Sequence, residues 1–244
     1  MLAASCQATR SIRAGRIGGM KLLAIDTSTE SGSIALLNDG ELLRRQCPAG
    51  RSHSETLLPL IRDTLHEASW CLAELAAIAF AAGPGSFTGL RVACGITQGL
   101  AFAHDLPVVA VGTLDAMALH SGGRRVIVLL DARMGEVYHG CFVDGQGVTA
   151  VAVDPPAQLP VPHTVGWLAC GNGLRHYPML RERLVDHVDA WLPELLPDAG
   201  AVALLGAEGL ACGKGIDAAE ATPLYVRNKI ALTVAERLAT GGKA

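Results

Sequence analysis

The sequence predicts an α/β protein made of two similar lobes, and three observations support this prediction. Short apolar segments of strand length alternate with segments whose apolar residues recur at helical spacing, a pattern typical of helices packed on sheets. Apolar residues make up 50% of the chain, but aromatic residues only 4%, and there are 28 glycines. Packing must therefore depend on close approach between backbones. The order apolar strand, Asp, Gly, strand, Asp-Gly occurs once in each half, which indicates duplicated lobes.

Three short strands open the first lobe. Residues 22–25 and 34–37 are continuous apolar runs, and the turn residues Asn38, Asp39 and Gly40 follow the second run. Asn or Asp before Gly between two apolar runs is typical of a tight hairpin, so a third strand is expected over 41–46.

A helix is expected after these strands. Ser52 and Glu55 have the spacing of a capping box, and Pro59 is expected to kink or delay the helix. The apolar residues at helical spacing are Leu57, Leu58, Ile61 and Leu65.

A buried strand over 78–82 and a glycine-rich turn over 83–89 come next, and a second helix is expected to run to about His104. Small residues recur every four positions along this helix, at Gly95, Gly99 and Ala103. Such a stripe permits close packing against another surface. A strand over 107–111 closes the first half.

The second half begins with an apolar strand over 126–130 that is followed by Asp131 and Gly135. The elements expected after it are a strand over 136–142, a turn at Asp144-Gly145, an irregular proline-rich connection, a strand over 167–171 and a helix over 202–211. We therefore expect an N-terminal lobe over 20–112 and a C-terminal lobe with its tail over 113–244.

Residues 1–19 differ from the rest of the chain. They are rich in Ser, Arg and Gly and show neither strand nor helix period. A transit peptide has this composition, but Met20-Lys21 directly precedes a strand, as a genuine start would. We expect residues 1–19 to be a disordered or wrongly assigned extension and the true start to be Met20.

Charge and cysteine content restrict the function. The chain has 20 basic and 23 acidic residues, and without residues 1–19 the balance is 17 to 23. A chain that binds nucleic acid alone usually has the opposite sign. Seven scattered cysteines without a C-x-x-C pair favour free thiols in the cytoplasm. Because no apolar run reaches the length of a membrane helix, no membrane association is expected.

Two motifs are candidate anion sites. The turn over 83–89 follows a strand and opens a helix, where free N–H groups attract phosphate, although a purely structural turn is an equal alternative. Asp26-Thr27-Ser28 at a strand end has groups for a magnesium-bound phosphate, or simply caps a hairpin. The candidate nucleotide-binding residues are Asp26, Thr27, Ser28, Gly83, Gly85, Ser86 and Thr88.

Signs of conventional catalysis are few. There is no G-x-S-x-G, no H-E-x-x-H, and none of the eight histidines has another at i+4. Glu55 beside His53, and Asp131 near Arg133, could form an acid–base set, but a capped helix start and a solvated charge pair are favoured. We predict no catalytic residue and no metal ligand.

Five segments strongly resemble one family. The chain is similar to the TsaB family, also called YeaZ, in the segments MKLLAIDTS (20–28), HSETLLPLI (53–61), GPGSFTGLRV (83–92), DARMGEVY (131–138) and PLYVR (223–227). Together they span nearly all of residues 20–230, and the third segment is the most specific.

This resemblance implies a two-lobed actin-like ATPase (ASKHA) fold, with duplicated mixed-sheet lobes flanked by helices. It also implies a non-catalytic cytoplasmic subunit required for N6-threonylcarbamoyladenosine (t6A) at position 37 of tRNAs that read ANN codons. The implied partners are the transferase TsaD and the ATPase TsaE, and tRNA is reached only through the complex. No cofactor is required; whether ATP or ADP binds at the complex interface stays open. The alternative is an enzyme, either a nucleotide hydrolase or a metalloprotease of the same superfamily.

The resemblance further implies that TsaB and TsaD pair their first lobes through two helices each, and that the same face forms a homodimer when TsaD is absent. The alternative is that the small-residue stripe packs on the protein's own sheet. The expected interface residues are Leu57, Leu58, Ile61, Leu65, Arg91, Gly95, Ile96, Gly99 and Ala103.

Overall fold

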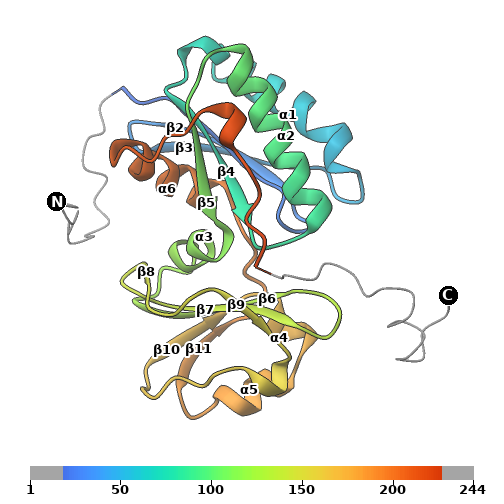
Figure 1. The fold of residues 1–244 in the computed structure, drawn as a ribbon, viewed down its shortest axis with the longest axis vertical. Coiled ribbons are helices and arrows are strands. Elements are labelled where there is room, and N and C mark those ends of the chain that lie inside the picture. The colour runs from blue at the N-terminus through green and yellow to red at the C-terminus, as the bar shows by residue number, and fades with distance from the viewer. Residues whose placement is uncertain (1–18, 227–244) are drawn as a thin grey trace.

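The computed structural model of the chain describes residues 19–226 and shows two lobes stacked along the long axis (Figure 1). Each lobe is built on one mixed β-sheet with helices packed against it. The predicted α/β class with two mixed-sheet lobes is therefore confirmed. No helix among the described residues is long and apolar enough to cross a membrane.

The first sheet has the strand order β3-β2-β1-β4-β5. Strands β1, β2 and β3 are antiparallel neighbours, whereas β4 and β5 run parallel to β1. The β2–β3 turn residues Asp39 and Gly40 have φ angles of 49° and 85°, as a type I′ hairpin requires. The strands are β1 (Leu22–Asp26), β2 (Ser33–Asn38), β3 (Glu41–Gln46), β4 (Ala77–Gly83) and β5 (Val108–Gly112).

The second sheet repeats this arrangement. Its order is β11-β10-β6-β7-β8, and β9 also pairs with β7. Strand β6 is antiparallel to β7 and parallel to β10, as β1 is to β2 and β4. The turn residues Asp144 and Gly145 have φ angles of 48° and 75°, so the hairpin turn is repeated too. The strands are β6 (Arg125–Asp131), β7 (Val137–Val143), β8 (Gln146–Gly147), β9 (Ala152–Asp154), β10 (Trp167–Cys170) and β11 (Val188–Leu192).

Helices cover both faces of the first sheet. Helices α1 and α2 pack on one face, where Leu23 and Leu57 belong to one core, and α3 and α6 pack on the other, where Leu22 and Ala203 belong to a second core. Helix α3 lies between the lobes and also contributes Met117 to the core of the second sheet. The helices are α1 (His53–Glu67), α2 (Phe87–Ala103), α3 (Thr113–His120), α4 (Gly173–His176), α5 (Met179–Leu184) and α6 (Ala199–Ala211), with short 3-10 helices η1 (Leu72–Glu74), η2 (Pro156–Gln158) and η3 (Ala218–Glu220).

Helix α6 returns to the first lobe, although it lies within the residues expected to form the second. Ala199, Val202 and Ala203 are buried against the first sheet. A Cβ at Gly206 would overlap the side chain of Ala79 on β4, so this contact depends on a glycine. The residues that build the first lobe are therefore not continuous in the chain, because α6, from the second half, covers one face of the first sheet.

The start of α1 differs from its expected form. Ser52 occupies the N-cap position, but its side chain does not cap the helix and instead lies 2.7 Å from the Ser54 hydroxyl. The expected capping box is therefore wrong. Pro59 lies inside the helix and does not delay its start.

The residues after η3 connect the two lobes. In this segment, which we call the strap (residues 221–226), the Ala221 carbonyl accepts a hydrogen bond from Gln98 on α2 (3.0 Å). Leu224 N donates to the Ala82 carbonyl on β4 (2.7 Å), and Val226 packs against the core of the second sheet. Figure 1 shows this red segment descending from the first lobe to the junction.

Candidate functional site

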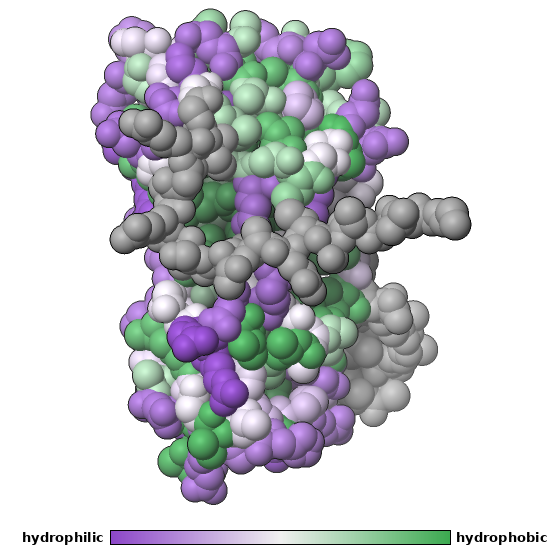
Figure 2. All heavy atoms as spheres, turned by 90° about the vertical axis from the view of Figure 1, so that its left-hand side faces the viewer, coloured by the Kyte–Doolittle hydropathy of each residue, from purple (hydrophilic) through white to green (hydrophobic). Residues whose placement is uncertain are grey.

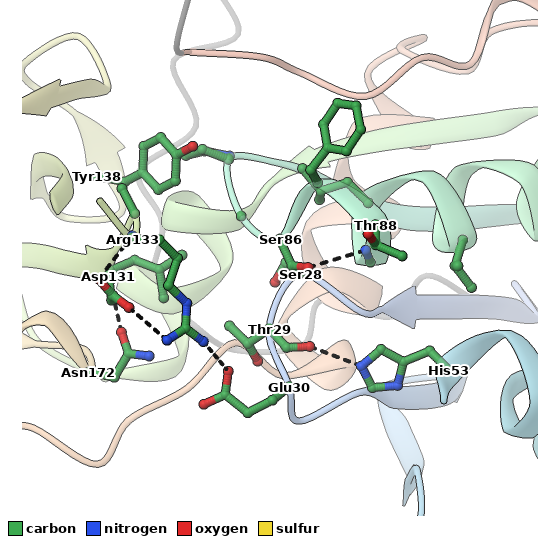
Figure 3. Close-up of a pocket in the computed structure, with 18 of the residues that line it drawn as sticks. Ser28, Thr29, Glu30, His53, Ser86, Thr88, Asp131, Arg133, Tyr138 and Asn172 are labelled. Carbon is green, nitrogen blue, oxygen red and sulfur yellow. Dashed lines mark hydrogen bonds and ion pairs between the residues drawn. The ribbon is translucent and has the colours of Figure 1, made fainter. Parts of the chain in front are cut away.

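A cleft of about 670 Å³ lies between the lobes. Its walls are the loop after β1, the start of α1, the glycine turn before α2, the ends of β6 and β7, and the strap. Figure 3 shows side chains of both lobes facing one another across it. On the face shown in Figure 2, hydrophilic and hydrophobic residues are mixed over both lobes.

The two predicted anion motifs pack directly against each other. A Cβ at Gly89 would overlap the Thr27 carbonyl oxygen, and one at Gly85 would lie 2.5 Å from the Ser28 carbonyl oxygen. Ser86 N donates to that Ser28 oxygen (2.7 Å), and the Thr27 hydroxyl donates to the Gly89 carbonyl (2.7 Å). These two glycines therefore allow the backbones of the two motifs to touch.

Three predicted nucleotide-binding residues do not line the cleft, and their role in nucleotide binding stays a prediction. Asp26 and Thr27 are fully buried behind the cleft. Gly83 has a φ of +129°, and a Cβ there would lie 2.5 Å from the Leu224 carbonyl oxygen of the strap. Gly83 therefore lies where β4, the strap and Leu90 of α2 pack together. The predicted residues that do line the cleft are Ser28, Gly85, Ser86 and Thr88.

The carboxyl group of Asp26 is buried and is held by hydrogen bonds from Ser28. Its Oδ1 accepts hydrogen bonds from the backbone N–H and the hydroxyl of Ser28, at 2.8 and 2.7 Å. Its buried Oδ2 has no hydrogen-bond partner among the described residues. Desolvation raises the pKa of this carboxyl above its ordinary value, although the hydrogen bonds from Ser28 oppose the shift. The carboxyl caps the end of β1.

Asp131 occupies the equivalent position at the end of β6, but it lines the cleft. Its Oδ1 accepts hydrogen bonds from Arg133 N (3.0 Å) and the Tyr177 hydroxyl (2.8 Å), while its own N–H donates to Asn172 (2.9 Å). Burial, and then the neighbouring Asp131, raise the pKa of Tyr177 to about 12. The Asp131 side chain is only 3% exposed, so the pair that it forms with Arg133 is partly buried, not fully solvated as expected.

Arg133 connects the lobes. Its guanidinium lies 3.3 Å from Asp131 and 3.8 Å from Glu30 on the opposite wall, as Figure 3 shows. Its side chain and that of Glu30 are mostly exposed, so this contact orients the lobes more than it stabilises them.

His53 holds the start of α1 against the loop after β1. Its Nε2 lies 3.0 Å from the Thr29 carbonyl oxygen, which only an N–H can bond, so Nε2 carries a proton and donates it to this oxygen. His53 beside Glu55 could form an acid–base set by residue type, but this contact gives the ring a structural role.

Some backbone N–H groups of the glycine turn are already bonded within the chain. Ser86 N donates to the Ser28 carbonyl oxygen. Gly89 N donates to the Ser86 hydroxyl (3.3 Å), and Leu90 N donates to the Ser86 carbonyl oxygen (2.8 Å). The residues from 19 to 226 contain no group of three or more His, Cys, Asp or Glu side chains placed to hold a metal ion. The arrangement is suited to holding two lobes and a helix start together.

The expected interface residues fall into two sets. Leu57, Ile61 and Leu65 are buried in the core of the first sheet, so their prediction as interface residues is wrong. Periodicity identified the apolar face of α1, and the protein's own sheet covers that face. The members that reach the surface are Leu58, Arg91, Gly95, Gly99 and Ala103, with Ile96 partly buried.

The small-residue stripe of α2 is open. A Cβ at Gly95 or at Gly99 would meet no atom within 4 Å, so the alternative that the stripe packs on the protein's own sheet is wrong. Phe102, which sequence analysis missed, is 80% exposed on the same helix. An unusually exposed aromatic residue beside an open stripe is typical of an interaction surface.

Comparisons with known proteins agree with the motifs. Residues 48–163 match the family model described as TsaD, tRNA N6-adenosine threonylcarbamoyltransferase. The chain is 36% identical to the tRNA threonylcarbamoyladenosine biosynthesis protein TsaB of Escherichia coli over 227 residues, which cover 87% of this chain and 96% of the relative. The TsaB of Haemophilus influenzae is also 36% identical, with 86% and 95% covered.

A solved structure is similar as well. The structure of YeaZ from Pseudomonas aeruginosa has a TM-score of 0.77 and 40% identity, and the match covers 84% of this chain and 99% of that one. These matches confirm the resemblance seen in the five sequence segments. The chain therefore belongs to the TsaB (YeaZ) family of tRNA threonylcarbamoyladenosine biosynthesis proteins.

Proposed function

We propose that this chain is a non-catalytic subunit that binds and activates TsaD, with TsaE as a further partner, in forming t6A on tRNAs that read ANN codons. The observation that supports this most is the uncovered surface of α2, where Gly95 and Gly99 leave room for a close helix contact in a chain of the TsaB family. A subunit that acts by association needs such a surface, and it needs no reactive group.

The residues of the cleft favour this role over an enzymatic one. A TsaD-type transferase holds its metal on two histidines spaced H-x-x-x-H, and none of the eight histidines of this chain has that spacing. Three N–H groups of the glycine turn, those of Ser86, Gly89 and Leu90, are bonded within the chain, which reduces the number of donors left for a phosphate. We therefore expect no cofactor to be required, and we expect any ATP or ADP in the complex to lie at its interface with TsaD.

Reconstitution tests the proposal. The full chain, TsaD and TsaE from the same source are mixed with tRNA, ATP and threonylcarbamoyl-adenylate, and t6A is measured by mass spectrometry of nucleosides. We expect t6A only when this chain and TsaD are both present, and none from the chain alone. Full t6A formation without the chain would refute the activator role.

The enzymatic alternative, a nucleotide hydrolase or a metalloprotease, is tested on the chain alone. We expect less than stoichiometric metal by elemental analysis and no ATP or casein hydrolysis above buffer. Stoichiometric bound metal together with either hydrolysis would favour the alternative.

We also propose that the chain alone forms a homodimer through the α2 surface and that TsaD displaces the second copy. Light scattering of the chain should then show a dimer, and addition of TsaD should yield a heterodimer. A monomer at all concentrations would refute the homodimer, and a dimer that persists inside the TsaD complex would refute the shared surface.

A further inference from the structure

Arg91 is the one charged residue in helix α2. It is exposed, and it lies one turn before Gly95 of the open stripe. Its guanidinium carbon lies 3.9 Å from the centre of the Phe87 ring, and its Nε donates a hydrogen bond to the Tyr225 hydroxyl of the strap at 3.2 Å. The rings of Phe87 and Tyr225 are themselves in contact, with centroids 5.7 Å apart.

These contacts hold the guanidinium in one orientation. The Phe87 ring covers one flat face and Tyr225 accepts from Nε, so the two terminal nitrogens remain as a fork for a partner. None of the ion pairs found among residues 19–226 involves Arg91. A fixed guanidinium fork that has no acidic partner within residues 19–226 matches the two oxygens of a carboxylate or a phosphate.

The surroundings favour a protein carboxylate over a nucleic-acid phosphate. Leu224 and Tyr225 of the strap are 51% and 42% exposed, so apolar surface continues from the α2 stripe past Arg91. The chain contains 20 basic and 23 acidic residues. That excess of negative charge repels a polyanion such as RNA, whereas a partner helix brings a single acidic group together with apolar surface.

We infer that Arg91 is the charged anchor of the α2 surface and takes one carboxylate from a partner protein whose contacting helix is otherwise small or apolar. Tyr225 is a positioning residue that orients Arg91, so the strap forms part of the docking surface. The inference rests on the proposed function, because it takes TsaD as the partner.

The test is calorimetric titration of TsaD into the full chain at about 0.05 M and 0.3 M salt. We expect Arg91→Ala to raise the Kd by about tenfold or more, the loss of one charge-assisted contact. Arg91→Lys keeps the charge without the fork and should recover part of that loss. Tyr225→Phe removes only the hydroxyl and should raise the Kd several-fold. Salt should weaken wild-type binding more than binding of Arg91→Ala, which a merely structural role of Arg91 would not produce.

Arg124→Ala is the matched control. Arg124 is also exposed, but it pairs with Asp144 in the second lobe, so its loss should leave the Kd for TsaD unchanged. Melting temperatures of all variants identify any loss of folding. If wild type binds TsaD and folded Arg91→Ala binds it with the same Kd, the role of Arg91 as an anchor is wrong, but the proposed function stands. If Tyr225→Phe leaves the Kd unchanged, the positioning role of Tyr225 is wrong. Absence of wild-type binding would overturn the proposed function and the anchor together. Binding of tRNA to the isolated chain that is lost in Arg91→Ala would assign Arg91 to phosphate and overturn the inference.

Discussion

Gly89 has no space for a side chain, because a Cβ there would overlap the Thr27 carbonyl oxygen. Either the loop after β1 or the start of α2 would have to move. We expect Gly89→Ala to lower the free energy of unfolding by about 2–4 kcal/mol, measured by urea denaturation. Gly95→Ala in the same helix is the control, since its Cβ meets no atom within 4 Å. Equal stability of the two variants would show that the two motifs separate without cost.

Asp26 makes stability depend on pH. Burial raises its pKa in the folded protein above the ordinary value of 3.8, so the folded state holds this proton more tightly than the unfolded state does. Its contribution to stability is therefore fully present below about pH 3.8 and is lost as the pH rises through the folded pKa.

Asp26→Asn removes this dependence and keeps an oxygen for the Ser28 hydrogen bonds. We expect the variant to gain stability relative to wild type as the pH rises from about 3.8 to 8, measured by urea denaturation at each pH. A difference that stays constant over this range would contradict the assigned pKa shift.

Residue patterns predicted the places of these motifs better than their roles. Asp26 and the glycine turn were correctly placed at strand ends, and both have the composition of a phosphate site. Their mutual packing joins residues about 60 positions apart, a contact that local spacing cannot reveal. The same limit applies to Leu57, whose helical spacing identified an apolar face without showing that the protein's own sheet covers it.

Substitution of the glycines in the α2 stripe by larger residues should raise the stability of the chain and weaken its binding to TsaD. Alanine at both Gly95 and Gly99 meets no steric obstacle and lowers the backbone entropy of the unfolded chain, so we expect about 1–2 kcal/mol of added stability. Added methyl groups at a close helix contact should weaken association with TsaD at the same time. Thermal melting and titration of the double variant check both changes.

The more bulky Gly99→Arg should remain folded, as a monomer that does not bind TsaD. If Gly99→Arg still binds TsaD and still dimerises, the interface lies on another face. Loss of folding in Gly99→Arg would contradict the open space around this glycine.

Element length decided which helices and strands could be predicted. Strand β1 is recognisable as a continuous apolar run, and helix α2 is long enough to show residues that recur every four positions. Helix α2 ends one residue before the expected end at His104. Helix α4 has four residues and strand β8 two, which is too short for a period to appear. Helix α6 was expected over 202–211, but its Ala-rich sequence is apolar on all sides and does not indicate which sheet it covers.

On the scale of the whole molecule, charge predicts how the chain behaves toward RNA. The chain has 23 acidic and 20 basic residues, so it has no excess of positive charge to attract a tRNA. We expect no tRNA binding by the isolated chain at about 0.15 M salt in a filter-binding assay, and binding when TsaD is added. Tight binding by the chain alone under these conditions would contradict this expectation.

The duplicated architecture was visible in the sequence because each lobe repeats a hairpin with Asp-Gly in its turn. Both sheets have the same order of parallel and antiparallel strands around β1 and β6. The repeat was predicted only from the first hairpin of each lobe, with its order apolar strand, Asp, Gly, strand and Asp-Gly. The crossing of α6 and the strap back to the first lobe involves contacts across more than 100 residues, and no local pattern encodes them.

The late position of α6 in the chain has a consequence for synthesis on the ribosome. The strands of the first sheet are complete at Gly112, but α6, which covers one of its faces, ends at Ala211. At about 5–20 residues per second, the nascent chain exposes that apolar face for roughly 5–20 seconds before its cover is made. The newborn chain is thus most prone to aggregation while its second lobe is being translated, and nascent chains halted before Ala199 should depend on chaperones that bind apolar surface.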